Sequence, residues 1–152
     1  MLVKEYISGG VFETQSLAAS FGERLWEGSC ILLCGDLGAG KTCFTQGLAK
    51  GLKIARTVSS PTFTLLKVYA EGRLVLFHLD AYRLENAFQD VGFSEFIGIT
   101  GVSVIEWPEN VRELLPREYL KVTIVFLEED SRQLVFEAVG EKYEKLLEEV
   151  IC

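Results

Sequence analysis

Eight consecutive residues of the chain have the types and spacing needed to bind the phosphates of a nucleotide. They match the pattern G-x-x-x-x-G-K-[ST] in full and run Gly35-Asp36-Leu37-Gly38-Ala39-Gly40-Lys41-Thr42. The three glycines allow backbone torsions that are closed to other residues, so that successive N–H groups can point at one anion. A helix that starts at the end of this segment adds its positive N-terminal end. The segment therefore predicts a phosphate-binding loop with a Walker A motif.

Within this loop we expect two side chains and several backbone groups to contact the nucleotide. Lys41 is expected to reach the β- and γ-phosphates as a binding and catalytic group, and the Thr42 hydroxyl is expected to ligate Mg²⁺. ATP and Mg²⁺ are thus the predicted cofactors. The other nucleotide-binding positions are expected to act mainly through backbone N–H groups, and they are Asp36, Leu37, Gly38, Ala39, Gly40 and Cys43.

Two acidic residues elsewhere in the chain are candidates for the rest of the metal site. Asp80 follows the apolar run 74–79, and Glu106 ends the apolar run 102–105. Because Mg²⁺ prefers near-octahedral oxygen coordination, a carboxylate at a neighbouring strand end is expected beside the loop. Each acid is therefore a predicted metal ligand and catalytic group. Their spacing does not assign which one holds the metal and which one positions water.

The elements that must position these residues alternate early in the chain and form hairpins late. The short apolar run Ser29 to Cys34 predicts a buried strand before the loop, and Lys41 to Leu52 predicts a helix after it. A helix is also expected from Glu13 to Trp26, with Thr14 as its N-cap. Further strands are expected at 63–70, 73–79, 101–107, 119–127 and 133–139, and further helices at 108–115 and 141–151.

These elements predict an α/β fold of the P-loop NTPase type. A mixed parallel and antiparallel central sheet between helices gives three layers, α/β/α, in a single nucleotide-binding domain over residues 1–152. The strands at 63–70 and 73–79 are separated by Glu71-Gly72 alone, which predicts a two-residue hairpin. The strands at 119–127 and 133–139 are expected to pair in the same antiparallel sense.

Composition and charge narrow the classes of function. The 152 residues are 49% hydrophobic and 24% charged, with a formal net charge of −7. A chain that grips DNA or RNA alone normally carries a basic face, so the acidic balance favours a basic protein partner instead. No apolar run approaches the roughly 20 residues that a bilayer span needs, and the N-terminal residues do not resemble a signal peptide. A cytoplasmic location without membrane contact is expected.

Four segments together resemble one known family. The phosphate loop is followed by Ser60-Pro61-Thr62-Phe63-Thr64, then by His78-Leu79-Asp80-Ala81-Tyr82-Arg83-Leu84, and then by Ile105-Glu106-Trp107-Pro108. This series, from about Glu13 to about Arg132, resembles the bacterial TsaE (YjeE) family. The resemblance implies an ATP hydrolase, slow in isolation, that is needed to make threonylcarbamoyladenosine in tRNA. It also implies TsaD and TsaB as protein partners, with tRNA engaged only indirectly through their complex.

The resemblance also implies roles for individual residues. Thr42 and Glu106 match the Mg²⁺ positions of the family, and Asp80 matches an acid near the metal and its waters. Thr62 matches a catalytic position in a switch-like loop near the γ-phosphate. Thr14 and Arg132 match positions near the base and sugar of the nucleotide. Cys43 departs from the family, which often has a second threonine there, but this position contributes mainly its backbone N–H.

Three other functions stay open beside this one. A regulatory GTPase of another P-loop class usually carries an Asn-Lys-x-Asp segment, which the chain lacks. A small-molecule kinase needs an arginine-rich lid, and the arginines here are scattered. A nucleotide-gated adaptor without catalysis is not decided by the sequence. The single histidine, His78, alternates with Phe77 and Leu79, which favours a packed or hydrogen-bonded side chain over a metal ligand or general base.

Overall fold

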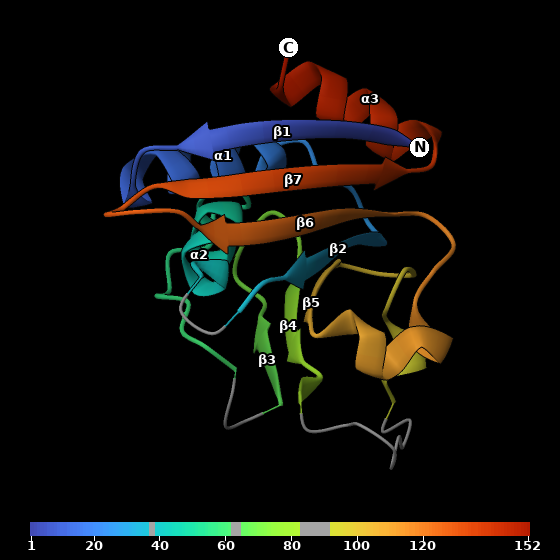
Figure 1. The fold of residues 1–152 in the computed structure, drawn as a ribbon. Helices are drawn as coiled ribbons and strands as arrows, with labels where there is room; N and C mark the ends of the chain where they lie inside the picture. The colour runs from blue at the N-terminus through green and yellow to red at the C-terminus, as the bar shows by residue number, and fades with distance from the viewer. Residues whose placement is uncertain (37–38, 62–64, 83–91) are drawn as a thin grey trace.

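A seven-stranded mixed sheet forms the centre of the molecule (Figure 1). The computed structural model describes residues 1–36, 39–61, 65–82 and 92–152. The spatial order is β1-β7-β6-β2-β5-β4-β3. Strands β6, β2, β5 and β4 run parallel, and β7, β1 and β3 add antiparallel pairs at the two sides. The strands are β1 (Leu2–Ser8), β2 (Ser29–Cys34), β3 (Leu66–Tyr69), β4 (Leu76–Asp80), β5 (Val102–Glu106), β6 (Tyr119–Phe126) and β7 (Arg132–Val139).

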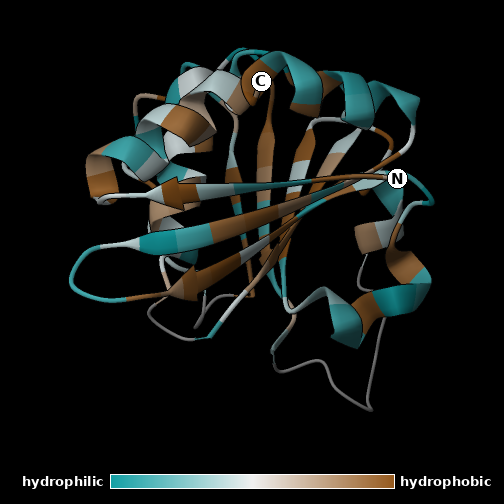
Figure 2. Ribbon diagram, turned by 45° about the horizontal axis from the view of Figure 1, so that its top comes forward, coloured by the Kyte–Doolittle hydropathy of each residue, from teal (hydrophilic) through white to brown (hydrophobic). Residues whose placement is uncertain are grey.

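Three α-helices cover one face of this sheet, and short 3-10 segments cover part of the other (Figure 2). The predicted α/β class with a mixed sheet between helical layers is therefore confirmed. Among the described residues, no helix has both the length and the apolar composition needed to cross a membrane. The helices are α1 (Val11–Gly22), α2 (Lys41–Gly51) and α3 (Glu141–Val150), and the 3-10 segments are η2 (Phe93–Glu95) and η3 (Pro108–Leu114).

The core lies between the α-helices and the sheet. Phe21 of α1 stacks on Phe136 of β7 with ring centroids 5.1 Å apart, and Phe44 of α2 packs against both. All three rings are fully buried. They pack α2 against the sheet, and this packing fixes the position of the first turn of the helix beside the end of β2. The predicted strand β2 is confirmed, and after Ser29 it is apolar because both of its faces are buried.

The predicted two-residue hairpin at Glu71-Gly72 is wrong, although β3 and β4 do pair antiparallel as expected. The connection spans residues 70–75 because it packs against the end of α2 instead of turning tightly. The Arg73 N–H donates to the Leu52 carbonyl, 2.6 Å away. A Cβ on Gly72 would lie 2.5 Å from the same carbonyl oxygen, so only glycine permits this approach.

The predicted N-cap at Thr14 is also wrong. Helix α1 begins at Val11, with Gly10 in the N-cap position, and Thr14 lies inside the helix. The Glu13 carboxylate accepts the Gly9 N–H at 2.7 Å, and the helix starts two residues before the expected Glu13. The Thr14 hydroxyl is buried and lies 2.6 Å from the Ser8 hydroxyl of β1, so it joins the helix to the sheet instead of capping it.

Helices α1 and α2 approach each other closely at Gly47, which gives a direct test of the packing. A Cβ at this position would lie 2.5 Å from the Gln15 carbonyl oxygen and 2.6 Å from the Ala18 Cβ. Alanine is the better helix former by about 1 kcal/mol. We nevertheless expect Gly47→Ala to lower the free energy of unfolding by about 1–3 kcal/mol, because the overpacked helices must separate.

Urea denaturation of the two proteins measures this difference. Gly10→Ala is the matched control, because a Cβ there would have no neighbour within 4 Å and the backbone is extended. Because alanine is less favourable than glycine at the N-cap position of α1, the free energy of unfolding of this control should fall slightly, by less than about 1 kcal/mol. A stabilised Gly47→Ala protein would mean that the two helices are not in this close contact.

Candidate functional site

The candidate site lies where the carboxyl ends of three parallel strands meet. Strand β5 pairs with β4 on one side and with β2 on the other, and this register places Glu106 beside both Asp80 and Leu33. Beyond Leu33 the chain enters the phosphate loop and then α2. The two acids that the sequence singled out are therefore neighbours on adjacent strands, next to the loop, as expected for carboxylates at neighbouring strand ends.

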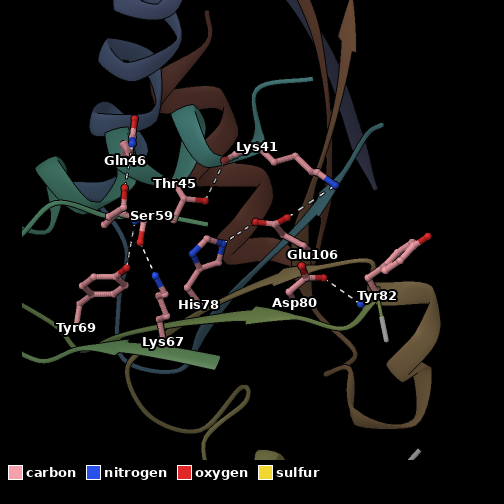
Figure 3. Close-up of polar contacts among 11 residues, drawn as sticks. Lys41, Thr45, Gln46, Ser59, Lys67, Tyr69, His78, Asp80, Tyr82 and Glu106 are labelled. Atoms are coloured by element: carbon pink, nitrogen blue, oxygen red, sulfur yellow. Dashed lines mark hydrogen bonds and ion pairs between the residues drawn. The ribbon is translucent and has the colours of Figure 1, made fainter. Parts of the chain in front are cut away.

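Lys41 links this loop to the acids (Figure 3). It is the first residue of α2, and its side chain is only 6% exposed. The Nζ atom lies 3.8 Å from Glu106 Oε1 and 4.6 Å from the centroid of the Trp107 ring. The Tyr82 ring also packs against the Trp107 ring, with centroids 4.9 Å apart. The lysine thus has an anionic and an aromatic partner within the site.

Glu106 has a different partner on each carboxylate oxygen. Oε1 faces Lys41, and Oε2 lies 2.7 Å from His78 Nε2. His78 is fully buried on β4, and Glu106 is 4% exposed. The sequence indicated that His78 is packed or hydrogen-bonded, and it is both. Its partner was not foreseen, because the two residues are 28 positions apart in the chain.

Asp80 is nearly buried and is held by its own loop. One oxygen, Oδ1, accepts the Tyr82 N–H at 3.0 Å. The Asp80 N–H donates to the Leu65 carbonyl, and the Glu106 carbonyl accepts the Ala81 N–H, so the backbone on both sides is fixed. No hydrogen bond to the second carboxylate oxygen is found among the described residues. These contacts give Asp80 a fixed position beside Glu106.

The first turn of α2 has the features of an anion site. Gly40 adopts the left-handed conformation at φ 112°, and no side chain caps the helix. The N–H groups of the first helical turn have no intrahelical acceptors, so an anion can accept them. A Cβ on Gly35, at φ 143°, would lie 2.5 Å from the Ile124 carbonyl oxygen, so the entry to the loop requires glycine.

The oxygen atoms here also suit Mg²⁺. Thr42 is half-buried in the first turn of α2, and Asp80 and Glu106 supply hard carboxylate oxygens. No group of three or more His, Cys, Asp and Glu side chains clusters for a metal within the described ranges. A divalent ion would therefore complete its coordination with phosphate oxygens and water, as Mg²⁺ commonly does.

Thr14 and Arg132, far apart in sequence, line one small pocket. The Arg132 Nε donates to the Ala39 carbonyl at 2.9 Å, and its guanidinium lies 4.6 Å from the Phe126 ring centroid. The pocket has a free volume of about 20 Å³, enough for a single water. In this conformation the pocket is too small for a nucleoside. The lining residues are Gly10, Val11, Thr14, Ala39, Gly40, Cys43, Ile124, Asp130 and Arg132.

Cys43 lines the same pocket, and its side chain makes a contact with α1 that the sequence did not predict. Its Sγ donates to the Val11 carbonyl at 3.7 Å and so ties the first turn of α2 to that of α1. Burial raises the pKa of this thiol above its ordinary value, and Arg132 opposes that shift. Cys43 therefore contributes a neutral thiol to the helix contact, beside its backbone N–H.

Some of the remaining predicted residues lie within the described part of the chain, and others lie outside it. Asp36 is exposed at the start of the loop, and the Ala39 N–H donates to its carbonyl at 3.0 Å. Leu37, Gly38 and Thr62 lie outside the described residues, as does Arg83. Trp107 lies directly after Glu106 in the left-handed conformation, at φ 59°. This strained backbone turns the indole toward Lys41, which no spacing rule in the sequence indicates.

Comparisons with known proteins identify relatives of the chain. A family model described as "Threonylcarbamoyl adenosine biosynthesis protein TsaE" matches residues 10–134. A relative from Bacillus subtilis, named tRNA threonylcarbamoyladenosine biosynthesis protein TsaE, is 44% identical over 138 residues, which cover 91% of this chain and 87% of the relative. A relative of the same name from Treponema pallidum is 44% identical over 130 residues, which cover 84% and 96%.

A solved structure is similar over nearly the whole chain. The crystal structure of Bacillus subtilis YdiB superposes with a TM-score of 0.85 at 37% sequence identity, covering 98% of this chain and 94% of that one. The similarity therefore includes the strands and the helices that build the site.

Proposed function

The chain belongs to the TsaE family, and from this membership we propose that it is a Mg²⁺-dependent ATPase serving threonylcarbamoyladenosine biosynthesis on tRNA. Its relatives carry that pathway in their names. The observation that carries the proposal is the position of Lys41. A buried lysine at an uncapped helix N-terminus, 3.8 Å from a strand-end carboxylate, suits a site where phosphate and a metal ion meet.

In this proposal, different residues of the site bind the phosphates, the metal ion and its waters. Lys41 and the N–H groups of the first turn of α2 bind the phosphates and orient the γ-phosphate. Thr42 and Glu106 hold Mg²⁺, with Asp80 as the acid that positions its waters. The bound ion would neutralise the charge that develops on the phosphate oxygens during transfer to water. The Trp107 ring covers one side of the lysine, which strengthens the attraction of the lysine for the phosphates.

The nucleoside is proposed to lie toward Thr14 and Arg132. The Arg132 guanidinium is anchored on Ala39 of the loop, so it is fixed relative to the phosphates. The chain has no Asn-Lys-x-Asp segment, the usual reader of guanine, and ATP is therefore the proposed nucleotide. A GTPase of another P-loop class and a nucleotide-gated adaptor are the alternatives that the experiment must separate.

The proposed partners are the TsaD and TsaB proteins, with tRNA bound only through them. The net charge of −7 opposes an autonomous grip on a phosphate backbone, which needs clustered Lys and Arg. The β6–β7 turn beside the nucleotide pocket is itself acidic and exposed at Glu128, Glu129 and Asp130. Such a surface suits a basic protein face better than RNA.

The test is ATP turnover by the purified chain, alone and with a TsaD–TsaB complex. We expect slow hydrolysis alone, a marked increase with the complex, and loss of both on chelation of Mg²⁺. GTP should compete weakly for the ATP site. Turnover that is absent under both conditions, with ATP still bound, would favour the adaptor. Equal or better competition by GTP would favour the GTPase.

A further inference from the structure

The single histidine of the chain is part of the candidate site, and among the described residues its ring bonds to Glu106 and to no residue of the phosphate loop. His78 lies on β4 opposite Val104 of β5, and its ring reaches diagonally across to Glu106, two residues further along β5. Asp80, two residues after His78, faces the same side of the sheet. The imidazole and Lys41 thus lie on opposite sides of the Glu106 carboxylate (Figure 3).

The arrangement of donors around Glu106 gives the histidine a distinct role. Lys41 lies 3.8 Å from Oε1 and His78 Nε2 lies 2.7 Å from Oε2. If Lys41 binds phosphate, as proposed above, it exchanges its partner Glu106 for a stronger anion. His78 is anchored in the sheet and fully buried, so it stays in place beside Glu106 when Lys41 moves to the phosphate. One oxygen of the carboxylate therefore stays tethered while the other becomes available.

The chemistry of the pair assigns the ring proton. An ionised carboxylate only accepts hydrogen bonds, so Nε2 carries a hydrogen and donates it to Oε2. Nδ1 is buried with no hydrogen-bond partner among the described residues. A buried polar atom without a partner costs stability, and an apolar side chain would fill this place in the sheet at lower cost. The packing alone therefore does not account for a histidine here.

We propose that His78 is a positioning residue for Glu106: its Nε2–H holds Oε2 so that Oε1 keeps its direction toward the phosphate and metal site when Lys41 leaves. The inference rests on the proposed ATPase function and adds a residue to it. Partners that orient a metal-binding side chain typically contribute 10–100-fold to metal affinity or activity. Lys41 is the proposed phosphate-binding residue and has no part in this positioning role.

Two variants separate positioning from packing. In His78→Gln the terminal amide nitrogen reaches about as far as Nε2, so it can donate to Glu106. In His78→Asn the amide reaches only to the place of Nδ1. We expect His78→Asn to lower kcat, or to raise the Mg²⁺ concentration for half-maximal turnover, by about 10–100-fold. Nucleotide affinity without Mg²⁺ should stay within about threefold of the wild type, and His78→Gln should recover most of the loss.

A spectroscopic readout tests the pair without any turnover. Because His78 is the only histidine, ¹⁵N-histidine labelling of the full chain gives one pair of ring signals. We expect a protonated Nε2 and a slowly exchanging Nε2–H, with the proton signal shifted in Glu106→Gln. Addition of Mg²⁺ with a non-hydrolysable ATP analogue should keep the Nε2–H bonded.

The outcomes distinguish the two proposals. If the wild type neither binds nor hydrolyses ATP with its partners, the proposed function fails, whatever the histidine signal shows. If the wild type turns over ATP and His78→Asn matches it in kcat and Mg²⁺ dependence, the positioning role alone fails. It also fails if both variants lose activity equally together with thermal stability, or if Nε2 carries no proton.

Discussion

Glu106→Gln is expected to lower ATP turnover by about 10²–10³-fold, the range found when one group that stabilises transition-state charge is removed. Glutamine keeps the shape of the side chain and an oxygen that can accept the His78 Nε2–H. It removes the negative charge that faces Lys41 at 3.8 Å and that is proposed to hold Mg²⁺. The loss should therefore fall on the step in which charge develops, and ATP affinity should change by less than about tenfold.

Single-turnover hydrolysis and equilibrium binding, measured on the same preparation, separate these two effects. Glu113→Gln is the matched control, because Glu113 is an exposed acid of η3 only seven residues away. That variant should resemble the wild type in both measurements. If Glu106→Gln loses affinity while retaining its rate of hydrolysis, Glu106 is a binding group and not part of the catalytic machinery.

The parts of this site that sequence could predict are the local ones. Strand β2, the phosphate loop and α2 follow one another within 23 residues, from Ser29 to Gly51, and each has its own signal. The convergence of Asp80 and Glu106 was predictable for a related reason. Each ends an apolar run, and parallel strands bring their carboxyl ends to the same edge of a sheet.

The parts that sequence could not predict depend on register and on contacts across the fold. The His78–Glu106 hydrogen bond requires that β4 and β5 pair with His78 opposite Val104, and no local pattern fixes this alignment. The indole of Trp107 meets Lys41 only because the backbone at Trp107 is left-handed. Both features involve side chains that the sequence had already singled out, but without their partners.

Strand β1 was not predicted, and its burial pattern explains why. The inward residues Leu2, Lys4 and Tyr6 include a charge, and the outward residues Val3, Glu5 and Ile7 include two large apolar side chains. Neither face is uniformly apolar, so the alternation that indicates a half-buried strand is missing. Lys4 is tolerated on the inner face because its Nζ donates to the Ile151 carbonyl near the end of the chain.

Lys41→Met is expected to weaken ATP binding by about 10–150-fold, which corresponds to the loss of a charge-assisted hydrogen bond of about 1.5–3 kcal/mol. Methionine retains an unbranched stem that can pack on the Trp107 ring, so the variant removes the charge and little else. The chain should remain folded without nucleotide, because Glu106 keeps its hydrogen bond to His78. Lys41→Arg keeps the charge but must fit a larger group into a site that leaves the lysine 6% exposed, so we expect an intermediate loss.

Thermal unfolding with and without ATP and Mg²⁺ reads out both stability and binding. At a ligand concentration of 100 times Kd, binding stabilises the wild type by about 2.7 kcal/mol. This raises Tm by about 5–10 °C for a chain of this length. A variant that binds about 100-fold more weakly gains only about 0.4 kcal/mol at the same concentration, which is about 1 °C. Lys50→Met, at the exposed end of the same helix, removes a lysine that donates to Gln15 Oε1 and should keep the full shift. If Lys41→Met keeps the full shift as well, its buried charge serves the Glu106 ion pair alone, and the phosphate site must lie elsewhere.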